Sequence, residues 1–239
     1  MRLGMRLAFA MAIALVLLPA RAAFAADDLD KVLRKLDVAA ANFHTTAADF
    51  KFDDIDTDPV PDDDVQTGVV YYERTGSKFQ MGVHIDQHNG KPAPKIYTYG
   101  NGVFELFEPP PINQVTTYTK ASKFESYVML GFGASGKDLE AKWDIKDLGS
   151  ENLNDGKTIV ETEKLELVAK DPEVRKNLTK VTIWVDLKRA VSLRQELHFG
   201  ASKKKVSVYT NIKVNVPKSI PADAFTFKTD GKTQHSTQQ

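Results

Sequence analysis

The sequence predicts a mainly β protein with helices, built on a single antiparallel sheet that is strongly curved or nearly closed. Apolar and polar residues alternate with a period of two over most of the chain, which is typical of strands with one covered face. We expect roughly ten such strands, and an open sheet of that size curls. Helical periodicity occurs in two places only, near the N-terminus and in the middle of the chain.

Residues 1–25 have the pattern of a secretory signal peptide. Arg2 and Arg6 precede an uninterrupted apolar run at residues 7–18, and Ala23-Phe24-Ala25 forms a cleavage site of the A-x-A type. The run is well short of the roughly 20 residues that a membrane-spanning helix needs. We therefore expect export to the periplasm, cleavage after Ala25 and a soluble product, since no cysteine follows that would accept a lipid anchor.

The composition excludes several classes of protein. The chain has 239 residues, 42% of them apolar, and no cysteine, which excludes a disulfide-stabilised scaffold, a thiolate zinc site and a cysteine nucleophile. The 32 basic residues balance the 32 acidic ones, and loss of the three arginines in the signal peptide leaves a net charge of −3. Nucleic-acid binders draw their affinity from Lys and Arg, so we expect no nucleic-acid partner.

A helix is expected at the start of the mature domain, which we place at residues 26–228. Its apolar residues recur at helical spacing and form one stripe, so the helix needs a surface to lie on. Asp27 and Asp28 lie at its N-terminal end, where they oppose the positive end of the helix dipole. The stripe consists of Leu29, Val32, Leu33, Leu36, Ala40 and Phe43.

Strands follow this helix. An acidic segment at residues 53–64 breaks the first strand, and Thr75-Gly76 is expected to turn the next two into a hairpin. Gly100-Asn101-Gly102 is a strong signal for a second hairpin, because glycine and asparagine tolerate positive φ. The expected strands in this half are residues 44–55, 65–74, 77–87, 95–99, 103–108 and 114–119.

The second half of the chain begins with a helical interlude. Short helices at residues 123–130 and 137–142 are expected to bracket Gly131-Phe132-Gly133, which we interpret as a hinge. A turn or short helix is expected at residues 171–176, and the polar tail at residues 229–239 is expected to be disordered. The expected strands are residues 143–148, 158–168, 181–185, 191–199 and 206–214.

The chain carries no catalytic motif. It lacks a G-x-S-x-G elbow, an S-x-x-K pair and a phosphate-binding glycine loop. His84 and His88 are four residues apart, but Ile85 stands where a zinc protease needs glutamate, so we interpret them as exposed imidazoles at a strand end. Two carboxylates that meet in a cavity would allow glycoside hydrolysis, although no spacing selects a pair. We therefore expect no catalysis, no cofactor and no metal.

The sequence contains two clusters of like charge. Seven aspartates lie between residues 53 and 64, yet Pro59 occupies the sixth position of an EF-hand loop aligned on Asp54, where glycine is required. We interpret this segment as a solvated, self-repelling loop, with an incidental calcium site as the alternative. Lys203-Lys204-Lys205 is expected to lie on a hairpin at another end of the molecule. The two clusters are candidate docking patches.

A series of short segments resembles a known family. Each segment alone is a strand or turn consensus, and their order over nearly the whole mature chain is more specific. The segments are residues 68–74, 78–81, 99–104, Phe107-Glu108-Pro109, Asn113-Gln114-Val115, residues 130–133, 182–186 and 209–213, and Ile220-Pro221 with Phe225. On these residues the chain resembles the LolA-like outer-membrane lipoprotein carriers and lipoprotein-sorting proteins.

The resemblance implies an unclosed β barrel with a helical lid over its apolar concave side. Carriers of this family take a triacylated lipoprotein from an inner-membrane transporter and pass it to an outer-membrane receptor. The family's lid-latching arginine falls on Arg74, although Thr75 follows it where the family usually has proline. The resemblance thus implies a periplasmic carrier, with a lipoprotein sensor or regulatory scaffold of the same fold as the alternative.

The expected ligands are acyl chains of lipoproteins or lipids, and the protein is expected to be a monomer. Burial of an acyl chain contributes about 0.8 kcal/mol per CH₂, so an apolar concave face holds lipid without specific polar contacts. A hinged lid at residues 124–132 would compete with this cargo. Ordinary core packing, and for Arg74 a surface ion pair, are the alternatives. The expected cavity and lid residues are Phe79, Met81, Val83, Phe104, Leu106, Tyr127, Leu130 and Phe132.

Overall fold

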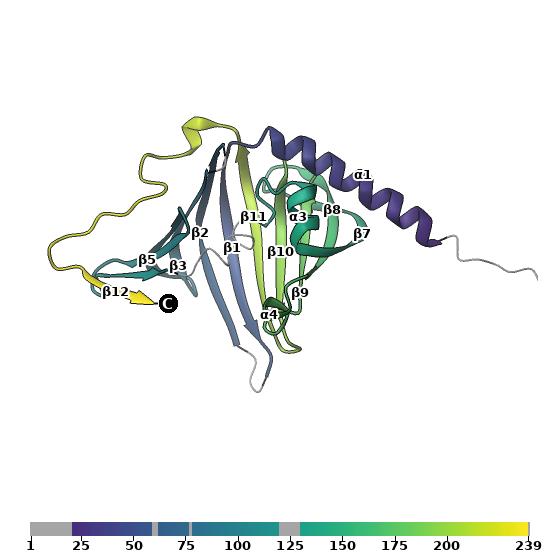
Figure 1. Ribbon diagram of the computed structural model, residues 1–239. Helices are drawn as coiled ribbons and strands as arrows, with labels where there is room; N and C mark the ends of the chain where they lie inside the picture. The colour runs from purple at the N-terminus through teal and green to yellow at the C-terminus, as the bar shows by residue number, and fades with distance from the viewer. Residues whose placement is uncertain (1–20, 59–61, 77, 120–129, 239) are drawn as a thin grey trace, which may run out of the picture.

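The computed structural model describes residues 21–58, 62–76, 78–119 and 130–238. Within these residues, twelve strands form one sheet in the order β12-β6-β5-β4-β3-β2-β1-β11-β10-β9-β8-β7, and the sheet does not close on itself. Figure 1 shows its strong curvature, with helices α1 and α3 on the side of β7 to β10. The predicted fold class, a curved and unclosed sheet with helices packed on it, is confirmed.

The strands are β1 Thr45–Asp56, β2 Asp62–Thr75, β3 Lys78–His88, β4 Lys91–Gly100, β5 Val103–Glu108, β6 Gln114–Tyr118, β7 Trp143–Asn154, β8 Ile159–Ala169, β9 Lys180–Asp186, β10 Val191–Phe199, β11 Lys203–Val214 and β12 Gln234–Gln238. The helices of the described residues are α1 Arg21–Ala41, α3 Gly136–Lys142, α4 Pro172–Arg175 and the 3-10 turn η2 Pro217–Ser219. The helix expected at residues 123–130 lies outside the described residues, apart from Leu130. Within the described ranges, every helix is too short or too polar to span a lipid bilayer.

The hairpin between β4 and β5 has the predicted turn. Asn101 and Gly102 both have positive φ, 52° and 78°, and Gly100 stands opposite Val103 across the turn. This is the geometry of a two-residue turn whose twist matches that of the flanking strands. The local sequence alone therefore determines the register of this hairpin.

The acidic segment differs from the loop expected at residues 53–64. Strand β1 continues to Asp56 and β2 begins at Asp62, with Asp54 opposite Asp64. On the other side of β1, Asp54 pairs with Lys205, and the two side chains lie 3.2 Å apart. Cationic neighbours on β11 reduce the repulsion that sequence reasoning predicted. The aspartates and the Lys203-Lys204-Lys205 cluster therefore lie side by side, and the expectation of two separate patches is wrong.

Helices α1 and α3 cover one end of the sheet. The apolar stripe of α1 packs as predicted, with Leu33 and Leu36 buried against Leu165 and Ile183. A Cβ on Gly136 would lie 2.4 Å from the carbonyl oxygen of Leu33, so this glycine lets α3 approach α1. The face of the sheet under these helices is called the inner face below.

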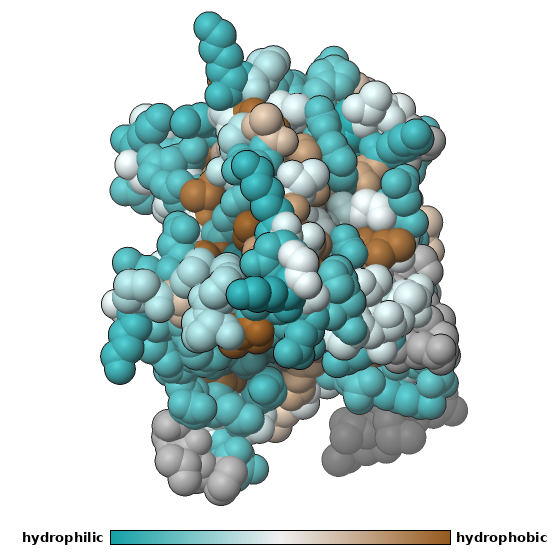
Figure 2. Space-filling view, turned by 90° about the vertical axis from the view of Figure 1, so that its left-hand side faces the viewer, coloured by the Kyte–Doolittle hydropathy of each residue, from teal (hydrophilic) through white to brown (hydrophobic). Residues whose placement is uncertain are grey.

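The C-terminal segment crosses the opposite, outer face before it joins the sheet. Phe227 stacks on Phe107 with 5.0 Å between ring centroids, and the backbone N–H of Gln234 donates to the Asn113 carbonyl over 2.9 Å. Strand β12 then pairs with β6 in parallel, while the other neighbouring strands are antiparallel. The disorder expected for residues 229–239 is therefore wrong for β12. Seen from this side, the surface is mainly hydrophilic with small, separate hydrophobic areas (Figure 2).

Candidate ligand-binding site

Cross-strand pairing shows that the inner face extends from the strands under the helices to the opposite end of the sheet. Ile183 stands opposite Gln195, Gln195 opposite Ser207, and Ser207 opposite Phe52. Side chains directly opposite one another on neighbouring strands lie on the same face. Phe52 and its neighbours on β1 to β5 therefore belong to the inner face, beyond the part that α1 and α3 cover.

A cavity of about 190 Å³ opens on this part of the inner face. Its wall on β1, β2 and β3 is apolar and aromatic, and its wall on β10 and β11 is polar. Val70 stands opposite Val83, and Tyr72 opposite Met81, so period-two alternation places all four side chains in the wall. The lining residues are Phe50, Phe52, Val70, Tyr72, Met81, Val83, Gln195, Ser207 and Tyr209.

The structure brings most of the predicted site residues onto this face. Met81 and Val83 line the cavity, and Phe79 contacts Tyr72 with ring centroids 5.7 Å apart. Phe104 and Leu106 lie further along the sheet, opposite Tyr99 and Tyr97, and do not line the cavity.

Sequence reasoning missed several lining residues and predicted one that the structure does not describe. Tyr127 lies outside the described residues. The alternation of β1 and β2 would have identified Phe50 and Val70 as lining residues. The polar wall carried no signal in the sequence.

Phe132 is fully buried beside the cavity. Its ring stacks on Tyr72 at 4.1 Å between centroids and meets Tyr209 edge-on at 4.8 Å, so it lies behind two lining residues. Backbone hydrogen bonds hold the chain around it: the N–H of Gly133 donates to the Ala190 carbonyl over 2.8 Å, and that of Ser192 to the Gly131 carbonyl over 2.6 Å. Phe132 therefore belongs to the apolar layer next to the cavity.

The glycines on either side of Phe132 are required for close packing. Gly131 and Gly133 have φ of 79° and 69°. A Cβ would lie 2.1 Å from Ser192 Oγ at the first and 2.4 Å from the Phe43 ring at the second. In the described residues, Gly131-Phe132-Gly133 forms a closely packed, clamped turn, and the interpretation of this motif as a hinge stays a prediction.

The polar wall is a chain of hydrogen bonds. Gln195 Nε2 donates to the carbonyl oxygen of Leu130, and the Tyr209 hydroxyl donates to Gln195 Oε1 over 3.4 Å. Burial raises the pKa of Tyr209 to about 12, and it raises the pKa of Tyr72 well above its ordinary value. Both phenols therefore remain neutral hydrogen-bond donors at physiological pH.

Arg74 lies near the end of β2, opposite Phe79, on the inner face. Its backbone N–H donates to the His44 carbonyl over 2.7 Å. To the described part of the chain its side chain makes no hydrogen bond or ion pair. The surface ion pair considered for Arg74 is therefore not seen there, and its role as a lid latch stays a prediction because residues 120–129 lie outside the described ranges.

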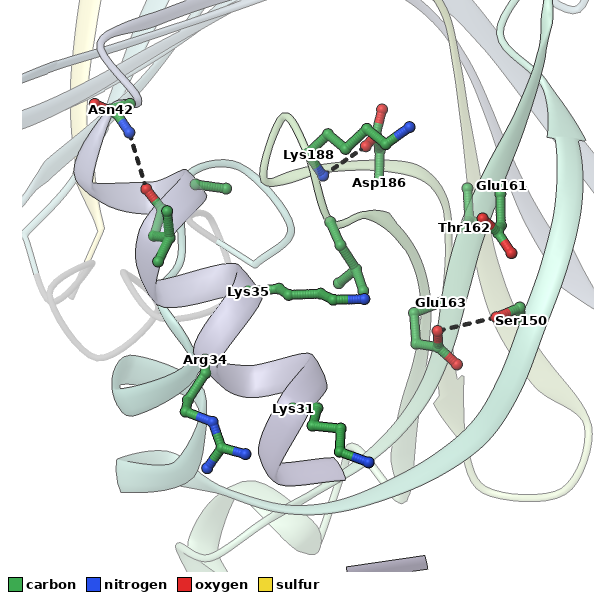
Figure 3. A pocket seen from close by; sticks show the side chains of 13 residues that line it. Lys31, Arg34, Lys35, Asn42, Ser150, Glu161, Thr162, Glu163, Asp186 and Lys188 are labelled. Atoms are coloured by element: carbon green, nitrogen blue, oxygen red, sulfur yellow. Dashed lines mark hydrogen bonds between the residues drawn. The ribbon is translucent and has the colours of Figure 1, made fainter. Parts of the chain in front are cut away.

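A second and larger pocket, of about 800 Å³, lies between α1 and strands β7 and β8 (Figure 3). Lys31 and Lys35 on α1 extend toward Glu163 on β8, so basic and acidic side chains face one another across it. Burial raises the pKa of Glu163, and a hydrogen bond with the neighbouring Asp147 raises it further. Opposed charges make this pocket less suited than the inner-face cavity to an apolar ligand.

The two histidines of the H-x-x-x-H motif lie on strand β3, as predicted, but both are half-buried, so the expectation of exposed imidazoles is wrong. His84 contacts the Ala224 carbonyl at 3.2 Å and packs edge-on against Tyr71, while His88 contacts Asp64. In the described part of the chain, His, Asp and Glu side chains do not gather in groups of three that would hold a metal ion. Both imidazoles therefore have structural partners.

No protein-family model and no curated protein matches the sequence. Among solved structures, the chain is similar to MucB, with a TM-score of 0.51 and 10% identity, over 88% of this chain and 66% of the MucB chain. LprF from Mycobacterium bovis gives a TM-score of 0.44 and 13% identity over 83% of this chain and 98% of its own. A LolA superfamily protein from Nitrosomonas europaea gives a TM-score of 0.40 and 14% identity, over 83% of this chain and 97% of its own. With its unclosed sheet, the chain has the LolA-like fold that the sequence predicted.

Proposed function

We propose that this protein is a periplasmic carrier that binds the acyl chains of lipoproteins or lipids and conveys them toward the outer membrane without catalysis. The observation that carries the proposal is the apolar cavity on the inner face of β1 to β3, with Phe132 packed beside it. Burial of each CH₂ contributes about 0.8 kcal/mol, so this wall binds a chain without specific polar contacts.

The size of the cavity supports a carrier that both binds and releases. At about 190 Å³ it is smaller than the roughly 300–1,000 Å³ of typical ligand sites, so an acyl chain has to displace part of the wall. Phe132 is the side chain that would move to make room for the ligand. Its ring packs directly against two lining residues, Tyr72 and Tyr209, so its departure would enlarge the cavity. Its return would compete with the ligand and keep the net affinity moderate.

The proposal includes the partners that the resemblance implies. An inner-membrane transporter would supply the lipidated cargo, and an outer-membrane receptor would accept it. The protein would act as a monomer, and Arg74 would hold the cavity closed between these two encounters. The half-buried position of Arg74 on the inner face, near the end of β2 and opposite Phe79, supports this role.

A regulatory scaffold that senses lipoproteins is the second candidate function. The observation that favours it is the similarity to MucB, which exceeds a TM-score of 0.5. A sensor binds the same ligand as a carrier but does not pass it on. Transfer from loaded protein to acceptor vesicles therefore separates the two functions.

Ligand binding is tested on protein purified without detergent from a periplasmic extract. Mass spectrometry of the extracted material is expected to find acyl chains, and the delipidated protein is expected to take up a fluorescent fatty acid. Val83→Asp places a charge in the apolar wall and should lower this uptake at least tenfold, because a buried charge is strongly disfavoured. Val103→Asp is the matched control, since Val103 is 39% exposed on β5. Protein that is free of lipid and takes up no fatty acid would overturn the proposal.

A further inference from the structure

The inner-face cavity has a polar wall that an acyl chain by itself does not need. Gln195 and Ser207 are buried, and with Tyr209 they form the side of the cavity on β10 and β11. Buried polar groups are kept where they have hydrogen-bond partners. Their hydrogen bonds connect the cavity to the backbone carbonyl of Leu130, which is close to Phe132 in the chain.

The direction of the hydrogen bonds is determined at the Leu130 end. A backbone carbonyl only accepts, so Gln195 presents its Nε2 to Leu130 and its Oε1 to Tyr209. The Tyr209 hydroxyl then donates to Oε1, and its oxygen is left to accept a hydrogen bond from Ser207. Gln195 is therefore the link between the cavity and the chain at residues 130–133.

Hydrogen bonds hold the turn at residues 130–133, and a buried hydroxyl beside it has no partner in the described part of the chain. Besides the Gln195 bond, it rests on the two backbone hydrogen bonds to Ala190 and Ser192. Ser192 Oγ is buried beside Gly131 and has no hydrogen-bond partner among the described residues. The closed arrangement thus leaves a buried hydroxyl unsatisfied, which lowers the cost of opening.

We propose that Gln195 is a positioning residue that couples occupancy of the cavity to the turn at residues 130–133, and that the cavity selects acyl chains with an adjacent hydrogen-bonding group. The polar group, such as an ester, amide or carboxyl, takes over a hydrogen bond of Tyr209 or Gln195. The Gln195 amide then releases the Leu130 carbonyl, and the turn carries Phe132 away from Tyr72. An alkane lacks that group and leaves the turn in place.

The inference rests on the proposed function, and its test separates the two. Hydrogen exchange is measured at the amides of Gly133 and Ser192, whose bonds open when the turn leaves. In the ligand-free protein, Gln195→Met should speed this exchange about threefold to tenfold, the effect of one lost hydrogen bond. The matched control is Gln66→Met, the same substitution at another glutamine. Gln66 stands opposite Phe52, and its side chain makes no hydrogen bond to any described residue.

Two probes of equal chain length test the selectivity. A medium-chain fatty acid amide should speed exchange at Gly133 in the wild-type protein, and the corresponding alkane should not. Tyr209→Phe keeps the ring against Phe132 and removes the hydroxyl, so it should abolish the difference between the effects of the two probes. This variant also tests the inference if Gln195→Met does not fold. Equal exchange in Gln195→Met, Gln66→Met and wild type, or equal effects of the two probes, would overturn the inference. Failure of both probes to bind while Gln195→Met still speeds exchange would overturn the proposed function and the selectivity, and leave the coupling supported.

Discussion

Glu163 lies on β8 facing α1, where other carboxylates surround it. Burial is the main cause that raises its pKa, and the hydrogen bond and charge of Asp147 add to it, while the Ser150 hydroxyl, which donates over 3.1 Å, acts in the opposite direction. A carboxyl whose pKa is raised by folding is more easily ionised in the unfolded chain. Ionised Glu163 therefore costs stability at every pH above its unfolded pKa.

Replacement of Glu163 by glutamine is expected to stabilise the protein at neutral pH. The gain should stay below about 1 kcal/mol, because Glu163 is only half-buried and water screens its neighbours. Wild-type Glu163 is protonated in both states at low pH, so the gain should vanish as the pH falls below about 4. Urea unfolding of both proteins at several pH values measures this.

Glu140→Gln is the control for this prediction, since Glu140 is exposed on α3. Its effect on the free energy of unfolding should be within about 0.5 kcal/mol at all pH values. A stability gain for Glu163→Gln that persists below pH 4 would contradict the assignment of the effect to ionisation.

At the scale of elements, the C-terminal segment depends on a glycine of β3. A Cβ on Gly82 would lie 1.7 Å from the backbone carbonyl oxygen of Ala224, which is itself fully buried. The segment therefore approaches the outer face as closely as two backbones can. This contact positions Phe227 on Phe107 and brings the chain to the edge of β6.

Gly82→Ala is expected to detach the C-terminal segment from the sheet. The clash is with backbone, so it should cost roughly 1–3 kcal/mol and expose the segment to protease. Limited proteolysis followed by mass spectrometry would show early cleavage between residues 216 and 233. In Gly100→Ala the nearest atom lies at 3.8 Å, so that variant should behave as wild type. Equal cleavage of the two variants would contradict the role of Gly82.

Elements with strong local signals were predictable, and elements that depend on distant partners were not. The apolar stripe of α1 and the Asn101-Gly102 turn could be predicted from residues that lie close together in the chain. Strand β12 was missed because all of its residues are polar, and it forms only where β6 offers an unpaired edge. The pairing of the acidic end of β1 with lysines was missed for a similar reason, since Lys203 and Lys205 come from β11, far along the chain.

At the scale of the whole molecule, α1 begins at Arg21, before the expected cleavage site after Ala25. Cleavage there would leave a shorter helix that has Asp27 and Asp28 in its first turn. Acidic residues in that position stabilise a helix by about 0.3–1 kcal/mol. An N-terminus at Ala26 would therefore suit the start of a helix.

The mature protein is expected to begin at Ala26 when it is recovered from the periplasm. Intact mass measurement and N-terminal sequencing check this. Ala25→Phe places a large side chain where the peptidase needs a small one, so the uncleaved precursor should accumulate in the membrane fraction. Periplasmic wild-type protein that retains residues 1–25 would contradict the prediction.

Local patterns in the sequence determined the fold class, most strand positions and part of the candidate site. Alternation places Met81 and Val83 on one face because successive side chains of a strand point to opposite sides. Phe132 was predicted as a lid residue, and the sequence did not show that its ring would be fully buried between Tyr72 and Tyr209. A single sequence position does not show which residues from distant strands will meet it.

By itself, the sequence determined the curved, unclosed sheet, the apolar stripe of α1 and the apolar side of the cavity, because these depend on periodicity and turn chemistry. Tertiary structure alone decided the polar wall of Gln195, Ser207 and Tyr209, the clamped turn around Phe132 and the pairing of aspartates with lysines. The physical reason is that hydrogen bonds and charges act between groups a few ångströms apart in space. Leu130 and Gln195 are 65 residues apart in the chain, and only the folded sheet brings them together.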